Sequence, residues 1–119
     1  MSRVSAVAVD PIRWDVPGPY TVAFSTRAGG VSEGPYGSLN LGALTADDPA
    51  APPENRRRLI QSLGGDPERA TMARQVHGGR VVRARATGVT APGADGAARY
   101  DECDGLWTGD EGQPLLLVT

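Results

Sequence analysis

The only histidine of this 119-residue chain lies in the run Gln75-Val76-His77-Gly78-Gly79. Alternating residues on either side predict strands over 71–76 and 81–85, so His77 is expected at a strand end. A neutral imidazole there, with glycine opening access, can serve as a metal ligand or as a general base. The alternative is a histidine that is hydrogen-bonded within its turn. Gln75 lines the same pocket if the two strands are neighbours.

A zinc site needs more ligands than this one histidine, about four when it is structural and about three plus water when it is catalytic. The other candidates are Cys103 and the carboxylates Asp101 and Asp104, but no CxxC or HxxxH spacing supports them. Cys103 and His77 could also form a nucleophile and its base. The acids that flank Cys103 disfavour the thiolate, which favours an ordinary thiol.

A second group of candidates lies in a glycine-rich loop over 26–37. The pair Gly29 and Gly30 lets the backbone approach a small anionic or polar ligand. Arg27 beside them offers a planar fork to phosphate or to a carboxylate, which makes it the candidate catalytic residue and a substrate-binding one. Its alternative role is a structural ion pair with Glu33 or Asp104.

Two asparagines complete the candidates. Asn40 and Asn55 are residue types that form turns or caps. The residues that we expect to bind substrate are Arg27, Gly29, Gly30, Asn40 and Gln75.

A helix is predicted behind this loop. Asp48 can cap it, Pro52 and Pro53 fit its first turn, and it runs through 54–63 to stop at Gly64-Gly65. Its buried stripe would be Leu59, Ile60 and Leu63, and Arg56-Arg57-Arg58 would be a solvated face.

The remaining elements are short strands. Trp14 is expected to be a core or lid residue between the first two, and 86–99 a surface excursion. The run over 115–118 is apolar throughout, which is typical of a strand buried on both faces. The expected strands cover 4–9, 20–25, 71–76, 81–85, 104–108 and 115–119, and alternation also resumes over 38–41.

The last of these strands stops at its own carboxyl end, where a chain normally continues into a loop. In open α/β sheets such strand ends carry the ligand site. We therefore expect a truncated chain, and an exposed terminal strand of this kind invites self-association.

Composition narrows the class of protein. The chain has 16 glycines and 10 prolines, which indicates many turns and argues against an all-helical bundle. The net charge of -2 gives no electrostatic footprint for nucleic acid, although all 12 basic residues are arginine. One cysteine, no unbroken apolar N-terminal stretch and no apolar run of roughly 18 residues predict a soluble, cytoplasmic protein.

Several motifs occur in an order that resembles one known family. They are FSTRAGGVSEGPYGSLNLG over 24–42, Asp47-Asp48-Pro49, Glu54-Asn55-Arg56-Arg57-Arg58-Leu59, Gln75-Val76-His77-Gly78 and Asp104-Gly105-Leu106-Trp107-Thr108. In this order they resemble the polyphenol oxidoreductase (laccase-like) family of purine nucleoside phosphorylases. The resemblance implies an α/β (α+β) fold, a mixed β-sandwich flanked by helices, of which residues 1–119 would be the N-terminal part of a single domain.

The resemblance also implies a zinc site, with copper in the older family naming. His77 matches the family's first metal ligand. The other two are a cysteine in an Ala-Asp-Cys segment after a strand like 115–119, and a histidine in a His-Ala-Gly-Trp-Arg-Gly segment, and neither occurs in this chain. Cys103 precedes its strand and does not match the family cysteine.

Three functions follow from these observations. The first is phosphorolysis of a purine nucleoside by phosphate, with adenosine deamination as a second reaction at the zinc site. The second is copper-dependent phenol oxidation, which one histidine and one cysteine cannot support, because it needs several copper sites. The third is a non-catalytic, partner-binding fragment. Because a metal held by one histidine is weak, we expect no efficient catalysis from these 119 residues alone.

Overall fold

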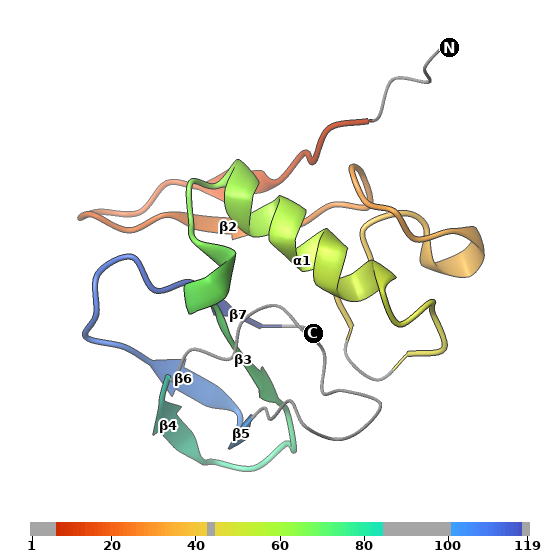
Figure 1. Cartoon of the computed structure of the whole chain (residues 1–119). Coiled ribbons are helices and arrows are strands. Elements are labelled where there is room, and N and C mark those ends of the chain that lie inside the picture. The colour runs from red at the N-terminus through yellow and green to blue at the C-terminus, as the bar shows by residue number, and fades with distance from the viewer. Residues whose placement is uncertain (1–6, 43–44, 85–100, 118–119) are drawn as a thin grey trace.

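The structure, a computed structural model, describes residues 7–42, 45–84 and 101–117 (Figure 1). This part contains one α-helix, α1 (Ala51–Ser62), and two 3-10 turns, η1 (Gly34–Tyr36) and η2 (Pro67–Arg69). No helix in these ranges is both long enough and apolar enough to cross a lipid bilayer. The strands of the described part are β1 (Ile12–Trp14), β2 (Val22–Phe24), β3 (Thr71–Arg74), β4 (Val81–Arg83), β5 (Asp101–Glu102), β6 (Gly105–Trp107) and β7 (Leu115–Leu116).

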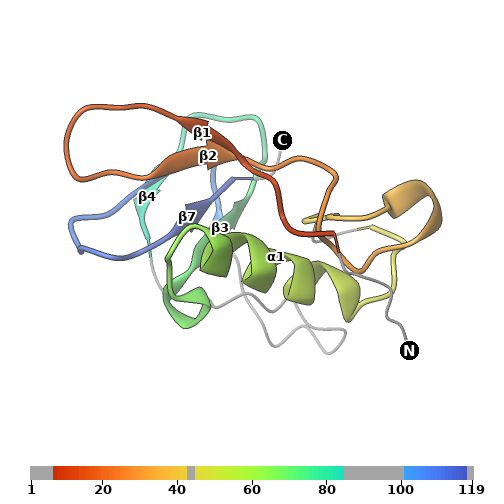
Figure 2. The same ribbon diagram turned by 90° about the horizontal axis from the view of Figure 1, so that it is seen from above.

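The strands form three small sheets. β1 and β2 pair antiparallel, β5, β3 and β7 form a parallel sheet in that order, and β4 pairs parallel with β6. Figures 1 and 2 show α1 running along one side of β3, β7 and the β1–β2 hairpin. The expected mixed α+β class is thus confirmed.

Helix α1 follows its sequence signals except at its start, where the N-cap is Ala50 and not the predicted Asp48. Before its first turn, the Asp48 carboxylate accepts a hydrogen bond from Ala50 N at 3.0 Å, and the Asp48 carbonyl accepts one from Ala51 N at 2.9 Å. After its last turn Gly64 has a φ of +82°, and Gly65 N donates to Ile60 O at 2.9 Å, which closes the helix end. The helix therefore starts at Ala51, one residue before the Pro52 and Pro53 predicted for its first turn, and ends at Ser62, just before the predicted stop at Gly64-Gly65. Its predicted apolar stripe is buried at Leu59 and Ile60 and half-buried at Leu63.

The prediction of a solvated arginine face is wrong for Arg56, which is 0% exposed. Its Nε donates to Leu41 O at 2.9 Å, so the guanidinium faces the loop that precedes the helix. Arg57 and Arg58 do lie nearer the surface. Their Nε atoms are 3.8 and 2.8 Å, respectively, from the carboxylate oxygens of Glu54. The physical reason is that α1 packs partly on loop backbone, whose carbonyls need donors, and not only on apolar side chains.

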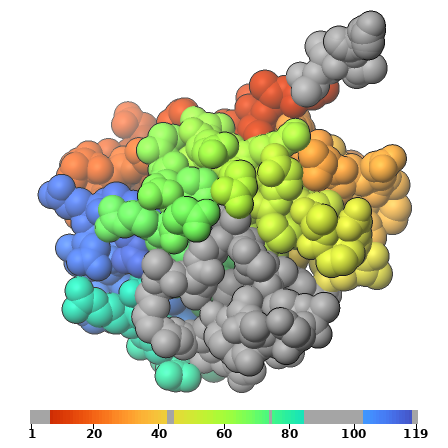
Figure 3. Space-filling model, in the orientation of Figure 1, coloured from red at the N-terminus to blue at the C-terminus, as the bar shows by residue number. Residues whose placement is uncertain are grey.

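Asn55, beside Arg56, is also 0% exposed and holds the same loop. Its Oδ1 accepts from Val31 N, and its Nδ2 donates to Ser32 Oγ and to Asn40 O, each at 2.8 Å. Asn55 thus acts as a buried clamp from the middle of the helix and caps neither end. Figure 3 shows the orange atoms of the loop lying directly against the yellow-green atoms of α1.

The N-terminal strands differ from expectation. Residues 7–9 are not a strand, and 4–6 lie outside the described residues. β2 lies inside the predicted 20–25, but its partner β1 was not predicted. Trp14 belongs to β1, is 60% exposed, and lies 5.6 Å from Phe24 between ring centroids, so it is not a core residue. The missed signal was the short alternation of Ile12 and Trp14, which a three-residue strand makes easy to overlook.

The later strands are confirmed in outline and corrected in pairing. β3 and β4 belong to different sheets, so the segments around His77 do not form a hairpin. β7 is a half-buried edge strand next to β3, and Leu117 after it is 55% exposed, so the prediction of burial on both faces is wrong. Residues 38–41 form no strand. The predicted excursion over 86–99 lies outside the described residues.

Candidate functional site

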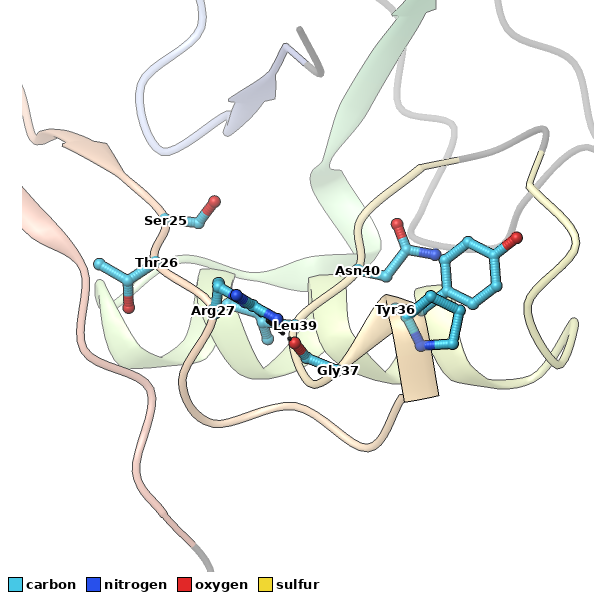
Figure 4. A pocket seen from close by; sticks show the side chains of 8 residues that line it. Ser25, Thr26, Arg27, Tyr36, Gly37, Leu39 and Asn40 are labelled. Carbon is cyan, nitrogen blue, oxygen red and sulfur yellow. Dashed lines mark hydrogen bonds between the residues drawn. The ribbon is translucent and has the colours of Figure 1, made fainter. Parts of the chain in front are cut away.

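An open hollow with a volume of about 540 Å3 lies on the loop between β2 and α1 (Figure 4). Two of its lining residues, Arg27 and Asn40, were predicted to bind substrate. The other lining residues were missed, although an aromatic side chain in a glycine-rich loop was a usable signal. The lining consists of Ser25, Thr26, Arg27, Pro35, Tyr36, Gly37, Leu39 and Asn40.

Arg27 is exposed and is held at one nitrogen. Its Nε donates to Gly37 O at 3.2 Å, the bond drawn as a dashed line in Figure 4. Among the described residues neither Glu33 nor Asp104 forms an ion pair with it. Its terminal nitrogens make no hydrogen bond within the described part of the chain, so the guanidinium can offer them to an anion.

The backbone of the loop folds around the carbonyl of Arg27. Ser38 N and Leu39 N both donate to Arg27 O at 3.1 Å, and Ser38 Oγ donates to it at 2.5 Å. Ser32 N donates to Ser38 O at 2.9 Å. These bonds explain why 38–41 does not pair as a strand: its amides close the loop that carries Arg27.

Gly29 and Gly30 are needed by this closure. Gly29 has a φ of +98°, and a Cβ there would collide with the backbone of Val9. A Cβ at Gly30 would collide with the Ser38 carbonyl. Both glycines lie outside the lining of the hollow, and their close contacts are with the protein's own backbone.

Asn40 lines the hollow beside Tyr36, but its amide is already engaged. Its Nδ2 donates to Asp47 Oδ2 at 3.2 Å and to Thr45 Oγ1 at 3.1 Å, and its Oδ1 accepts from Gly42 N at 3.1 Å. Asn40 therefore shapes the wall of the hollow.

Asp47 supports the same wall from outside the lining. The hydrogen bond from Ser32 Oγ, at 2.5 Å, is the largest influence and lowers the pKa of the Asp47 carboxyl. Partial burial opposes this, while the hydrogen bonds from Asn40 and from the Asp48 backbone add to it, so the pKa is lowered overall. The carboxylate is the form that the loop stabilises.

His77 lies in a different place, on the exposed turn between β3 and β4. It is the one non-glycine residue with a positive φ, +58°, in the described part of the chain. The Asp104 carboxylate accepts hydrogen bonds from Val76 N at 3.0 Å, His77 N at 2.8 Å and Gly78 N at 2.5 Å.

These contacts set the charge state of Asp104. Burial is the largest single influence and would raise the pKa of its carboxyl. The hydrogen bonds from Gly78, His77 and Val76, together with the charge of His77, outweigh burial and lower the pKa overall. The turn is therefore built around a carboxylate anion.

The structure does not bring all predicted residues into one hollow. Gln75 and His77 are exposed and are not part of the lining around Arg27. Cys103 is 0% exposed, with its Sγ 3.3 Å from the Gly105 carbonyl, to which it donates. In residues 7–42, 45–84 and 101–117 no three His, Cys, Asp or Glu side chains lie close enough to hold a metal ion. His77 can supply one ligand of such a site, and the described residues do not complete it.

The fold and these two places define a mixed α+β protein with a loop suited to an anion and an accessible histidine. A family model described as multi-copper polyphenol oxidoreductase laccase matches residues 21–119, and the chain belongs to this family. The expected resemblance is thereby confirmed.

Curated relatives of the chain are named purine nucleoside phosphorylases. The protein of Streptomyces griseus is 42% identical over 105 residues, which cover 87% of this chain and 40% of that protein. The protein of Corynebacterium glutamicum is 38% identical over 100 residues, 84% of this chain and 38% of that protein. The chain thus spans well under half the length of these relatives.

Solved structures agree with this relationship. The chain resembles YlmD from Geobacillus stearothermophilus with a TM-score of 0.69 and 34% identity, over 82% of this chain and 36% of that one. It also resembles the YfiH protein of Bacillus licheniformis, with a TM-score of 0.71 and 30% identity, over 82% of this chain and 36% of that protein.

Proposed function

We propose that this chain takes part in purine nucleoside phosphorolysis, in which a nucleoside and phosphate give a free base and ribose 1-phosphate. The observation that carries the proposal is the Arg27 guanidinium, which lies at an open hollow and, among the described residues, is held at Nε alone. The names of the Streptomyces and Corynebacterium relatives support it. The cytoplasm, where nucleosides and phosphate are both available, is the proposed location.

In this reaction Arg27 holds the phosphate. A phosphate oxygen attacks C1′ of the ribose, the glycosidic bond breaks, and its electron pair leaves with the base nitrogen. A guanidinium fixed against Gly37 stabilises phosphate charge without reorganising, which favours the bound and reacting geometry. The hydroxyl of Ser25 lines the same hollow and can donate to a phosphate or ribose oxygen, whereas the Thr26 hydroxyl already donates to Asp10 O at 2.9 Å.

His77 is proposed as one ligand of a zinc ion. A bound zinc would supply Lewis-acid polarisation or an activated water, the latter for adenosine deamination. The described residues do not complete such a site, so no step of phosphorolysis is assigned to the metal. What this chain contributes is an imidazole on an exposed turn whose backbone is fixed by Asp104.

Two other functions are ranked below phosphorolysis. Copper-dependent phenol oxidation has the family description in its favour, but it requires more copper ligands than one histidine and one buried cysteine. Partner binding or self-association is favoured by the edge position of β7 and by the exposure of Leu117.

The proposal is tested by adding inorganic phosphate to the isotope-labelled chain and following its amide signals by NMR. We expect the shifts to concentrate at 25–27 and 36–40 and to disappear in Arg27→Ala. Arg13→Ala is the matched control, because Arg13 is also exposed and also donates to one backbone carbonyl, Ser62 O at 3.3 Å. Equal phosphate shifts in the Arg27 and Arg13 variants would rule out the phosphate role.

A further inference from the structure

The turn that carries His77 is organised by a residue 27 positions further along the chain. Asp104 lies just before β6, and its Oδ1 accepts from Val76 N and His77 N while its Oδ2 accepts from Gly78 N. Three successive backbone amides that converge on one point form a concavity for an anion. Here the anion is a side chain of the same protein.

Asp104 is itself held against the other end of the turn. Its backbone N donates to Arg80 O at 3.0 Å, and the β4–β6 pairing begins at the next residues, Val81 opposite Gly105. Asp104 therefore links the segment after β3, through its carboxylate, to the start of β4, through its backbone N–H, and these two strands belong to separate sheets. This bridge fixes the turn from both sides.

The contact matters most at His77. A φ of +58° is unfavourable for a residue with a side chain, and such a residue persists only where its surroundings hold it. The amides of His77 and of both its neighbours are bound by the same carboxylate, so the direction of its Cα–Cβ bond is set by Asp104. That direction decides where the imidazole can reach.

We propose that Asp104 is the positioning residue for His77. Asp104 positions His77 by filling the concavity formed by the three amides. Because its carboxylate oxygens are engaged there, Asp104 is neither the partner of Arg27 nor a first choice as a metal ligand. The inference rests on the proposed function in one respect, which is that His77 is positioned in order to bind zinc. Removing the carboxylate is expected to release the turn while leaving the sheets and α1 in place.

The variants Asp104→Asn and Asp104→Ala test this on the whole chain. Asparagine keeps Oδ1 as an acceptor for Val76 N and His77 N but places an NH2 group opposite Gly78 N. Alanine removes all three hydrogen bonds. The matched control is Asp110→Asn, a carboxylate 56% exposed and 3.7 Å from Arg83, which also removes one negative charge near β6.

The first measurement is amide hydrogen exchange with water at Val76, His77 and Gly78. We expect about tenfold to a hundredfold faster exchange at all three amides in the alanine variant, the range expected for loss of hydrogen bonds to a charged group. In the asparagine variant only Gly78 should accelerate. The control should match the wild type, and α1 amides should be unchanged in all variants.

The second measurement is the residual dipolar coupling of the His77 Cα–Cβ bond. It should fit the structure in the wild type, be retained in Asp104→Asn, and shrink in Asp104→Ala as the bond averages over directions. Exchange within twofold of wild type at the three amides in the alanine variant would overturn the positioning role. So would an acceleration shared equally by α1, since that would mean general destabilisation.

Titration of the same samples with Zn2+, followed at the His77 ring protons, separates this inference from the proposed function. A wild-type ring that does not respond to zinc contradicts the metal role of His77 but leaves the exchange result standing. A ring that responds while the exchange pattern stays unchanged in Asp104→Ala contradicts the positioning role alone.

Discussion

Replacing Asn55 by alanine should loosen the loop around Arg27 and lower the stability of the fold. Asn55 is 0% exposed and makes hydrogen bonds of 2.8 Å to Val31 N, Ser32 Oγ and Asn40 O. The variant leaves Val31 N and Asn40 O without this partner and removes the donor to Ser32 Oγ, which still donates to Asp47 Oδ2. Water can reach Val31, which is 40% exposed, more easily than Ser32, which is 6% exposed.

The expected cost follows from these contacts. A lost hydrogen bond costs about 1 kcal/mol, and a buried group left unsatisfied costs about 1–3 kcal/mol. Alanine has a better helix propensity than asparagine, and this offsets roughly 0.5 kcal/mol of the destabilisation. The free energy of unfolding should therefore fall by about 3 kcal/mol in Asn55→Ala.

The assay is urea unfolding with linear extrapolation, followed by the helical circular dichroism signal. Gln61→Ala is the control, because it removes an amide from an exposed position of the same helix and should change stability by no more than about 0.5 kcal/mol. If the two variants agree to within about 1 kcal/mol, the clamp role of Asn55 is refuted.

Two further predictions concern charge and metal. Because the pKa of Asp47 is lowered in the fold, its carboxylate stabilises the protein above the ordinary value of 3.8, and this contribution is lost as the pH falls through the lower folded-state pKa. The thermal midpoint of Asp47→Asn should therefore fall less steeply than that of the wild type between about pH 5 and pH 2.5. An equally steep fall in the two proteins would contradict this prediction. Calorimetry with Zn2+ should show only weak binding, lost in His77→Ala, and no base release from inosine by this chain alone. Tight binding with turnover would mean that nearby residues complete a site.

The elements that could be predicted from the sequence are those with a regular hydrophobic pattern or clear end signals. α1 was predicted from its prolines and from Gly64-Gly65, and β2 from alternation, because helix-end residues and periodicity are local signals. The burial of Arg56 was not predictable in the same way. A charged residue on a helix reads as solvated unless the partner surface is known, and here that surface is the Leu41 carbonyl of a loop.

The residues of the candidate site also differ in whether local sequence signals or tertiary contacts reveal their roles. Arg27 and His77 could be chosen by residue type and glycine context alone. The role of Asp104 could not, since it depends on a contact across 27 residues and on a positive φ that only the folded turn reveals. The glycine pair marks a close backbone approach, as its type suggests, but Gly29 approaches the backbone of Val9 and Gly30 that of Ser38, and the sequence alone cannot tell a protein neighbour from a ligand.

The proposed role of Arg27 is to bind the phosphate that cleaves the nucleoside. A direct test grafts this chain in place of the matching segment of the Streptomyces griseus relative and measures hypoxanthine release from inosine against phosphate concentration. We predict phosphate-dependent release, with the KM for phosphate raised about tenfold or more in Arg27→Ala and unchanged in Arg13→Ala. A folded, active graft whose phosphate KM is the same with and without Arg27 would contradict the claim.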